Sequence, residues 1–282
     1  MQIAKTTIQD ILSKTLKWKP FKYSHVQKLL PSHHKQRKAF CKWILEQPED
    51  FPDKVLWSDE KWWVLHHRPN RQNDRYWAAH NPHQYVECNV QGDVKAMSWV
   101  GVMNGQVVSV YWFVDEDGEN VSVNQKRYEK MLREDVMPKV YQKFGIDLSE
   151  YWFQQDGATC HTTKKVLAYL KSKFQTRIIS RNADKANRGG VNWPSRSPDL
   201  NPLDYWFWSH CQKIVKEKCR VDNVYVPPDD IRDIMHLVEE VADEMTPDVI
   251  RKSCRDIRKR AQMCLAQRGK HFQHLIKHSR GH

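Results

Sequence analysis

The chain has 282 residues, of which 28% are charged and 40% are hydrophobic. This composition supplies enough apolar material for a folded core and excludes wholesale disorder. The length corresponds to about two domains, or to one large domain with an appendage. No stretch approaches the ~18 consecutive apolar residues of a membrane span, and the start MQIAKTTIQD lacks the apolar core of a signal peptide. Integral-membrane and secreted proteins are therefore poor interpretations.

Lysine and arginine are concentrated at the two ends of the chain. Residues 1–45 and residues 251–282 each hold ten Lys or Arg and one acid, a formal charge of +9 per segment. Since the whole chain carries +12, the centre at 46–250 carries −6. Basic ends suit a polyanion such as DNA, and an acidic centre suits a carboxylate site that metal ions neutralise. Charge alone leaves open the alternative that these lysines and arginines only keep the protein soluble.

The seven cysteines are dispersed and include no CxxC pair, which favours a reducing compartment over a disulfide framework or a zinc ribbon. Cys160-His161 and His210-Cys211 are adjacent pairs, but neighbouring residues seldom face one site and no third ligand is evident. A zinc site or a thiol nucleophile is therefore a weak alternative. The sequence also lacks the phosphate-binding GxxxxGK[ST], GxGxxG, GxSxG and HExxH motifs.

Hydrophobic periodicity predicts two helices and a strand in the first part of the chain. The helices cover 6–16 and the segment from Ser32 to about Leu45, where Ser32 is the expected N-cap. Residues 55–65 alternate as a buried strand, with Trp57 and Asp59 on one face and Glu60 on the other. Residues 66–93 are polar and predict a long loop.

The rest of the chain alternates between strands and helices. Two apolar runs on either side of Asn104-Gly105 predict a hairpin. The elements expected next are a helix over 124–144, a strand at 151–156, a helix over 162–173, a strand at 176–180, a loop over 181–202, a helix over 204–218 and a helical, polar last sixty residues. This order indicates an α/β domain in which helices cover a mixed sheet over roughly 50–220.

Three aspartates lie at positions that suit a metal-binding or catalytic site. Asp59 lies in mid-strand among tryptophans, Asp156 ends a strand, and Asp204 begins a helix. Acids on apolar strands are costly unless they are paired or bound to metal, and strand ends are where α/β folds place their sites. Each acid alone also has a structural interpretation: Asp204 suits the helix dipole and Asp199 suits a turn. Glu60 points away from the Asp59 face and is expected to be a salt-bridge partner or a surface residue.

The segments WSDEKWW, QQDGATCH and WPSRSPDLNPLDYWFW, in this order, resemble the three catalytic blocks of Tc1/mariner-type transposases. NRQNDRYWA and VKAMSWVGVMNG are similar to that family as well, and the match covers about residues 6–220. The resemblance implies an RNase H-like, retroviral integrase-like fold with helical N- and C-terminal extensions. It also implies a triad of metal ligands, Asp59, Asp156 and Asp204. Asp in the third position is typical of the mariner branch, and Asp199 belongs to the motif without being a ligand.

The activity that the resemblance implies is cut-and-paste DNA transposition. Asp59 would bind two Mg²⁺ or Mn²⁺ ions, of which Asp156 would bind one and Asp204 the other. The two ions would promote phosphodiester cleavage and strand transfer. The implied partners are double-stranded DNA, as terminal inverted repeats and as target DNA with TA insertion sites, and a second subunit reached by the loop at about 66–93. The implied location is the nucleus, with no membrane association.

The chain departs from the family at two places. Asp156 and Asp204 are separated by 47 residues, more than is usual, and the additional residues lie in RNADKANRGGVN. Loop growth costs little because closure entropy rises only logarithmically. The family normally begins with two helix-turn-helix units, of which only the last helix is recognisable. We therefore expect a remnant of that module with a basic linker helix at 1–50, a catalytic domain at 51–220 and a basic helical extension at 221–282.

Weak base readout and salt-dependent phosphate binding are expected from such a chain. The predicted DNA contacts are Lys17, Lys19, Lys22, Arg255, Arg258 and Lys259. Two functions compete with transposition. One is a truncated or domesticated transposase-derived DNA-binding or chromatin protein without chemistry, and the other is a nuclease without joining activity. The intact triad favours an enzyme, and the missing N-terminal module favours the silent DNA-binding protein.

Overall fold

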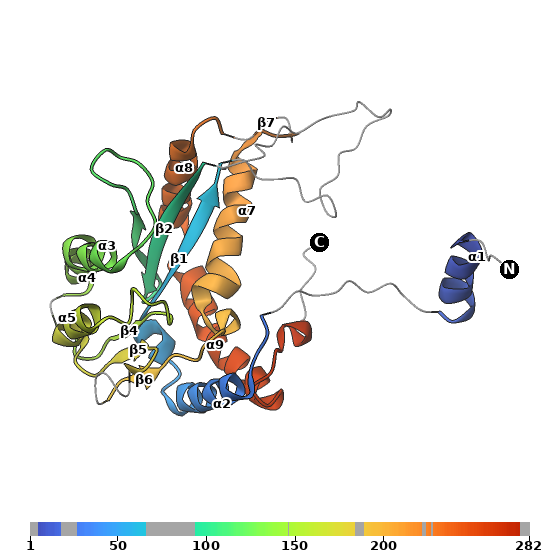
Figure 1. Cartoon of the computed structure of the whole chain (residues 1–282), viewed down its shortest axis with the longest axis horizontal. Coiled ribbons are helices and arrows are strands. Elements are labelled where there is room, and N and C mark those ends of the chain that lie inside the picture. The colour runs from blue at the N-terminus through green and yellow to red at the C-terminus, as the bar shows by residue number, and fades with distance from the viewer. Residues whose placement is uncertain are drawn as a thin grey trace.

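The computed structural model describes residues 5–17, 27–65, 94–145, 147–183, 189–221, 224–226 and 228–276. Its centre is a six-stranded mixed sheet in the order β3-β2-β1-β4-β5-β6 (Figure 1). The antiparallel part consists of β1 (Val55–Val64), β2 (Lys95–Met103) and β3 (Gln106–Trp112). The parallel part joins β1 to β4 (Trp152–Gln154), β5 (Ile178–Ser180) and β6 (Val191–Asn192).

The β2–β3 hairpin turns at the predicted Asn104-Gly105 pair. Both residues have positive φ, 49° and 76°, as the two central residues of a type I′ turn require. A side chain at position 105 would also approach the carbonyl oxygen of Pro247 to 2.9 Å. Glycine therefore serves both the turn and the close packing of this turn against the C-terminal helix.

One face of the sheet is covered by the central helices. These are α3 (Gln125–Met131) with the π-helical η3 (Leu132–Val136), α4 (Met137–Phe144) and α5 (Lys164–Phe174), which confirm the helices predicted over 124–144 and 162–173. They lie together on one side of the sheet in Figure 1. Their buried side chains form one core cluster with strand residues that include Leu56, Trp99, Phe153 and Ile178.

The other face is covered by helices from both ends of the chain. They are α2 (Pro31–Glu46), α7 (Trp208–Lys218), α8 (Ile231–Glu244) and α9 (Pro247–Ala266). Trp57 and Trp63 of β1 belong to the core cluster on this face, so the predicted two-faced alternation of β1 is confirmed. The N- and C-terminal helices thus share a core with the central sheet. The division at residues 50 and 220 stays a prediction.

Several elements differ from the sequence prediction. Helix α2 begins at Pro31 with Leu30, rather than the expected Ser32, as its N-cap, because proline is preorganised for the first helical position. The predicted loop at 181–202 contains the short strand β6. A small hairpin, β7 (Arg220–Val221) with β8 (Val224–Tyr225), lies where the predicted polar, helical last sixty residues begin, and the helices that follow it bury apolar faces.

The remaining described segments are short. They are α1 (Lys5–Asp10), η1 (Ile11–Thr15), η2 (Phe51–Lys54), η4 (Pro198–Leu200), η5 (Leu203–Phe207) and η6 (Gln273–Leu275). α1 and η1 together correspond to the helix predicted over 6–16. The loop predicted to contact a second subunit, 66–93, lies outside the described residues. Among the described helices, none is long and apolar enough to cross a membrane.

Candidate active site

Asp59 is held in the middle of β1 by strand β2 and by helix α7. It pairs with Val100 of β2, and Nε1 of Trp208, from α7, donates a hydrogen bond to its Oδ2 atom at 2.7 Å. The Trp208 ring packs edge-on against Trp63, a residue further along the same face of β1. One carboxylate oxygen is therefore oriented by an indole group that belongs to the same helical segment as Asp204.

Asp156 follows the end of β4, the strand beside β1. Leu56 pairs with Phe153, so β1 and β4 run side by side up to three residues before Asp59 and Asp156. Ser58 extends this contact, because its Oγ atom donates to the Gln154 carbonyl at 2.7 Å. Asp59 on β1 and Asp156 after β4 thus come from neighbouring parts of the sheet.

Asp204 lies on η5, the π-helical turn that leads directly into α7. The Oδ1 atom of Asn201 accepts a hydrogen bond from the Leu203 amide at 3.2 Å and so caps this start. The Asp204 side chain is exposed, in contrast to its buried neighbours Leu203 and Phe207. The predicted helix start is confirmed, with a π-helical first turn.

The three acids influence one another electrostatically. Burial, followed by the charges of Asp204 and Glu60, raises the pKa of Asp59 well above its usual range. Desolvation and the charge of Asp156 raise the pKa of Asp204 to about 7, an effect that solvent partly screens because the residue is exposed. Although burial acts in the opposite direction, hydrogen bonds from His161 and the Ala158 amide lower the pKa of Asp156.

The chemistry of this donor set suits a divalent cation. Carboxylate oxygens are the ligands that Mg²⁺ and Mn²⁺ prefer, and a cation would relieve the repulsion that raises the pKa values of Asp59 and Asp204. Within the described part of the chain, however, no three His, Cys, Asp or Glu side chains are gathered closely enough to hold a metal ion. The ligand roles of the triad therefore stay a prediction.

Two residues beside the triad were not predicted to belong to the site. His161 is buried, its Nδ1 atom lies 2.7 Å from Oδ1 of Asp156, and its Nε2 atom lies 3.0 Å from Oε1 of Glu60. The Nε2–Oε1 contact lacks hydrogen-bond alignment, so both atoms are without a hydrogen-bonding partner among the described residues. Burial lowers the pKa of His161, but the charge of Glu60 and the contact with Asp156 outweigh it and raise the pKa well above the usual range. Glu60 is an ion-pair partner, as expected from its face of the strand.

Asp199 has a structural role. Both of its carboxylate oxygens accept hydrogen bonds from the Arg37 guanidinium at 2.6 Å, and both side chains are almost completely buried. Arg37 also donates to Ser197 Oγ and to the Gly269 carbonyl, each at 2.9 Å. This ion pair fastens the loop before Asp204 to α2 and to the turn after α9. It also occupies both oxygens of Asp199, as expected for a residue of the motif that is not a ligand.

The predicted DNA contacts differ in their availability. Lys17 and Lys259 are exposed, whereas Lys19 and Lys22 lie outside the described residues. Arg255 forms an ion pair with Asp53.

Arg258 donates to carbonyl oxygens at the end of α2, Ile44 at 3.1 Å and Gln47 at 2.8 Å among them. Arg255 and Arg258 therefore have partners inside the protein, a use of arginine that charge counting alone cannot distinguish from phosphate binding.

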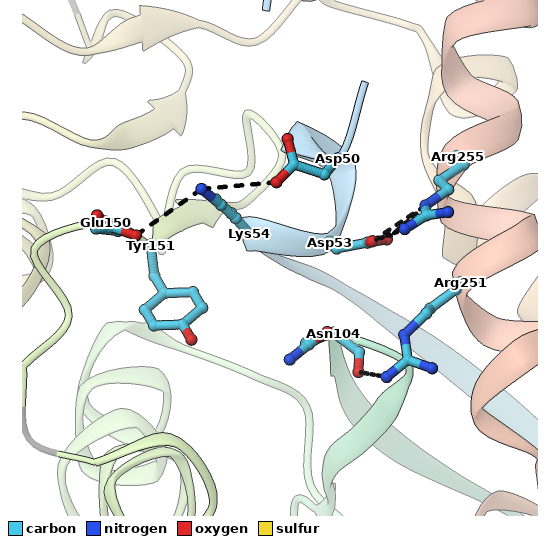
Figure 2. A pocket seen from close by; sticks show the side chains of 8 residues that line it. All are labelled: Asp50, Asp53, Lys54, Asn104, Glu150, Tyr151, Arg251 and Arg255. Carbon is cyan, nitrogen blue, oxygen red and sulfur yellow. Dashed lines mark hydrogen bonds and ion pairs between the residues drawn. The ribbon is translucent and has the colours of Figure 1, made fainter. Parts of the chain in front are cut away.

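A separate pocket of about 340 Å³ lies at the start of β1 (Figure 2). Lys54 lies 3.7 Å from Asp50 and 3.8 Å from Glu150, and Arg255 is paired with Asp53. The remaining lining residues are Asn104, Tyr151 and Arg251. The three acids balance the three basic residues, and none of the triad lines this pocket, so it is distinct from the candidate active site.

Comparisons with known proteins agree with the predicted resemblance. No protein-family model matches the chain. A segment of 123 residues is 28% identical to the transposable element Tcb2 transposase of Caenorhabditis briggsae, and covers 42% of this chain and 38% of that protein. The match thus spans about two-fifths of the curated relative.

Solved structures of Mos1 mariner transposase share the fold. The paired-end complex with Mn superposes with a TM-score of 0.73 at 17% identity, covering 96% of this chain and 72% of that one. The strand transfer complex gives 0.71 at 17% identity with the same coverage. The isolated catalytic domain gives 0.62 at 18% identity, covering 89% of this chain and all of that one. The predicted RNase H-like mixed sheet flanked by helices is confirmed: the chain resembles the Tc1/mariner-type transposases in sequence and has the fold of the Mos1 catalytic domain.

Proposed function

We propose that the protein is a DNA transposase of the cut-and-paste type, which cleaves phosphodiester bonds at element ends and joins them to target DNA. The observation that carries this proposal is the placement of Asp59 on β1 and of Asp156 directly after the neighbouring strand β4, with Asp204 on the helical segment whose Trp208 donates a hydrogen bond to Asp59. A sequence and a fold that both resemble transposases support it.

The chain's own residues would orient the reacting groups. Asp59, Asp156 and Asp204 would hold two divalent cations, Mg²⁺ or Mn²⁺, with Asp59 shared between them. Bound there, the cations would supply charge stabilisation for the attacking and leaving oxygens. Trp208 fixes the direction of one Asp59 oxygen. Mos1 paired-end complexes with Mn and with Mg are consistent with a divalent cation at such a site.

The same proposal includes the partners. Double-stranded DNA, as terminal inverted repeats and as TA target sites, would lie against the basic parts of the chain, and two subunits would act together. Complexes of Mos1 with paired ends and after strand transfer support both parts. An enzyme acting on chromosomal DNA in a cell with a nucleus would work there.

The test is strand transfer from a pre-cut duplex with a free 3′-OH into a supercoiled plasmid, with Mn²⁺ or Mg²⁺. Asp156→Ala should abolish the joined product, whereas Asp243→Ala, an exposed acid on α8, should not. Equal product from wild type and Asp156→Ala would overturn the assignment. DNA binding by wild type without any product would favour the transposase-derived binding protein. Cleavage without joining would favour the nuclease.

A further inference from the structure

The cluster around His161 links β1, which carries Asp59, to the segment after β4, which carries Asp156. We propose that His161 is a positioning residue, which holds the Asp156 carboxylate in one orientation and ties it to β1 through Glu60. This inference deepens the proposed function and rests on it, because Asp156 is there a metal ligand.

The His161 ring is held in place on several sides. The Tyr128 ring lies against it with centroids 4.2 Å apart, and Tyr128 is itself completely buried. Gln155 accepts a hydrogen bond from the Tyr128 hydroxyl at 3.0 Å and donates to the His161 carbonyl at 2.9 Å. Its Nε2 atom also donates to Ser180 Oγ at 3.0 Å. Tyr128 thus packs against the imidazole, and Gln155 fixes the backbone of His161, which together direct Nδ1 toward Asp156.

That direction selects one oxygen of Asp156. Oδ1 lies 2.7 Å from His161 Nδ1 and accepts the Ala158 amide at 2.8 Å. Among the described residues Oδ2 has no hydrogen-bonding partner, and 46% of the side chain is exposed. The carboxylate is thus anchored by one oxygen and presents the other. Such support is what orients a ligand around a metal.

Glu60 supplies the connection to the first acid. It follows Asp59 in β1 and points to the opposite face, where its Oε1 atom lies 3.0 Å from His161 Nε2. Only 10% of the Glu60 side chain is exposed, so the contact is shielded from water. The path from Glu60 through the imidazole to Asp156 fixes the position of β1 relative to the loop after β4. It therefore also fixes the separation of Asp59 and Asp156.

The decisive comparison is between two substitutions of His161 in the full chain. His161→Asn retains an N–H group near the place of Nδ1, whereas His161→Gln places its amide near Nε2 and loses the Asp156 contact. Binding of Mn²⁺ alone is measured by electron paramagnetic resonance of the free ion, and melting without metal reports folding. His236→Asn, at an exposed histidine on α8, is the matched control.

We expect His161→Gln to weaken Mn²⁺ binding about 10- to 100-fold, the range of supporting residues around metal ligands. His161→Asn should weaken Mn²⁺ binding clearly less, and His236→Asn should leave Mn²⁺ binding unchanged. Equal losses for the Asn and Gln variants, or wild-type binding by a folded His161→Gln variant, would overturn the role of His161. A merely structural role would lower the melting temperature of both variants without separating their Mn²⁺ affinities.

The proposed function is judged separately in the same experiment. Mn²⁺ binding by wild type that Asp156→Ala abolishes establishes the metal site before His161 is considered. Absence of Mn²⁺ binding by the wild-type chain would overturn the proposed function, and this inference with it. Binding that depends on Asp156 but is equal in the His161→Gln variant would overturn this inference alone.

Discussion

Asp59 combines a position inside an apolar strand with a hydrogen bond from Trp208. We predict that Asp59→Asn lowers strand transfer by about 10²–10³-fold or more, the scale of losing one preorganised charge-stabilising group. Duplex binding should stay within about twofold of wild type, because the substitution adds no negative charge. Product yield on gels and fluorescence anisotropy of a labelled duplex measure the two effects. Parallel loss of both would show that the substitution disturbs the fold.

Asp199 illustrates a buried charge that depends on its partner. Replacing it by alanine leaves the Arg37 guanidinium unpaired in the core, so we predict a loss of about 3–5 kcal/mol in the free energy of unfolding. Glu240→Ala breaks an exposed pair with Lys218 and should cost far less, because solvent screens this pair. Urea titration of the two variants measures the difference. Equal, small losses would show that Arg37 reaches water when Asp199 is removed.

At the scale of elements, α9 uses adjacent basic residues in different ways. Arg258 donates to the last carbonyl groups of α2, whereas Lys259 is exposed. We predict that Arg258→Met lowers the free energy of unfolding by about 1.5–3 kcal/mol and leaves the salt dependence of DNA binding unchanged. Lys259→Met should leave the free energy of unfolding unchanged. It should reduce the slope of log K against log salt by about 0.9, the effect of losing one phosphate contact.

Urea titration and DNA binding at several salt concentrations separate the two residues of this pair. A reduced slope for Arg258→Met would show that its guanidinium leaves α2 to bind DNA. An unchanged slope for Lys259→Met would remove it from the DNA contacts.

The elements that could be predicted from sequence are those with local signals. Asn104-Gly105 specifies its own turn, and the alternation of Trp57, Asp59 and Trp63 specifies a strand with one face toward the core. β6 has only two residues and exists because β5 offers it a partner, so nothing local marks it. The apolar face of α9 is hard to recognise in the sequence, since long charged side chains surround its buried positions.

In the candidate site too, some residues could be predicted from the sequence and others could not. The triad could be predicted because the motifs resemble a family. The pairing of His161 with Glu60 is not visible in the sequence, because the contact joins β1 to the turn after β4 and neither residue carries a motif that indicates the other. The partners of Arg255 and Arg258 could not be predicted either, because an arginine that binds phosphate and one that binds a carbonyl look alike in sequence.

For the whole molecule, the raised pKa values of the acids make stability depend on pH and metal. Asp204 has a pKa of about 7 in the folded state and an ordinary value of 3.8. A carboxyl group whose pKa is higher in the folded state contributes its full stabilisation at pH values below the unfolded-state pKa. That contribution is lost as the pH rises through the folded-state pKa. We predict that the melting temperature without metal falls between about pH 4 and 7, and that Asp204→Asn makes this slope shallower. An unchanged slope in the variant would exclude Asp204 as its source.

Metal binding should offset the loss of stability that accompanies ionisation of Asp204. At a hundred times its dissociation constant, a cation adds about 2.7 kcal/mol to stability, which corresponds to a rise of about 5 °C in melting temperature for a chain of this size. The shift with Mn²⁺ should be larger at about pH 8 than at about pH 6, because a protonated Asp204 competes with the cation. Differential scanning fluorimetry at the two pH values measures both. Equal shifts would contradict this competition.

The packing of α2 against α9 has a consequence for gene copies that carry a premature stop codon. Phe40, Cys41 and Ile44 are covered by a helix that begins only at Pro247, and the Arg37–Asp199 pair is closed by the carbonyl of Gly269. A reading frame that stops before Pro247 still encodes Asp59, Asp156 and Asp204. Its product lacks the helix that covers this core, so it would be aggregation-prone and open to proteolysis although its catalytic motifs are intact.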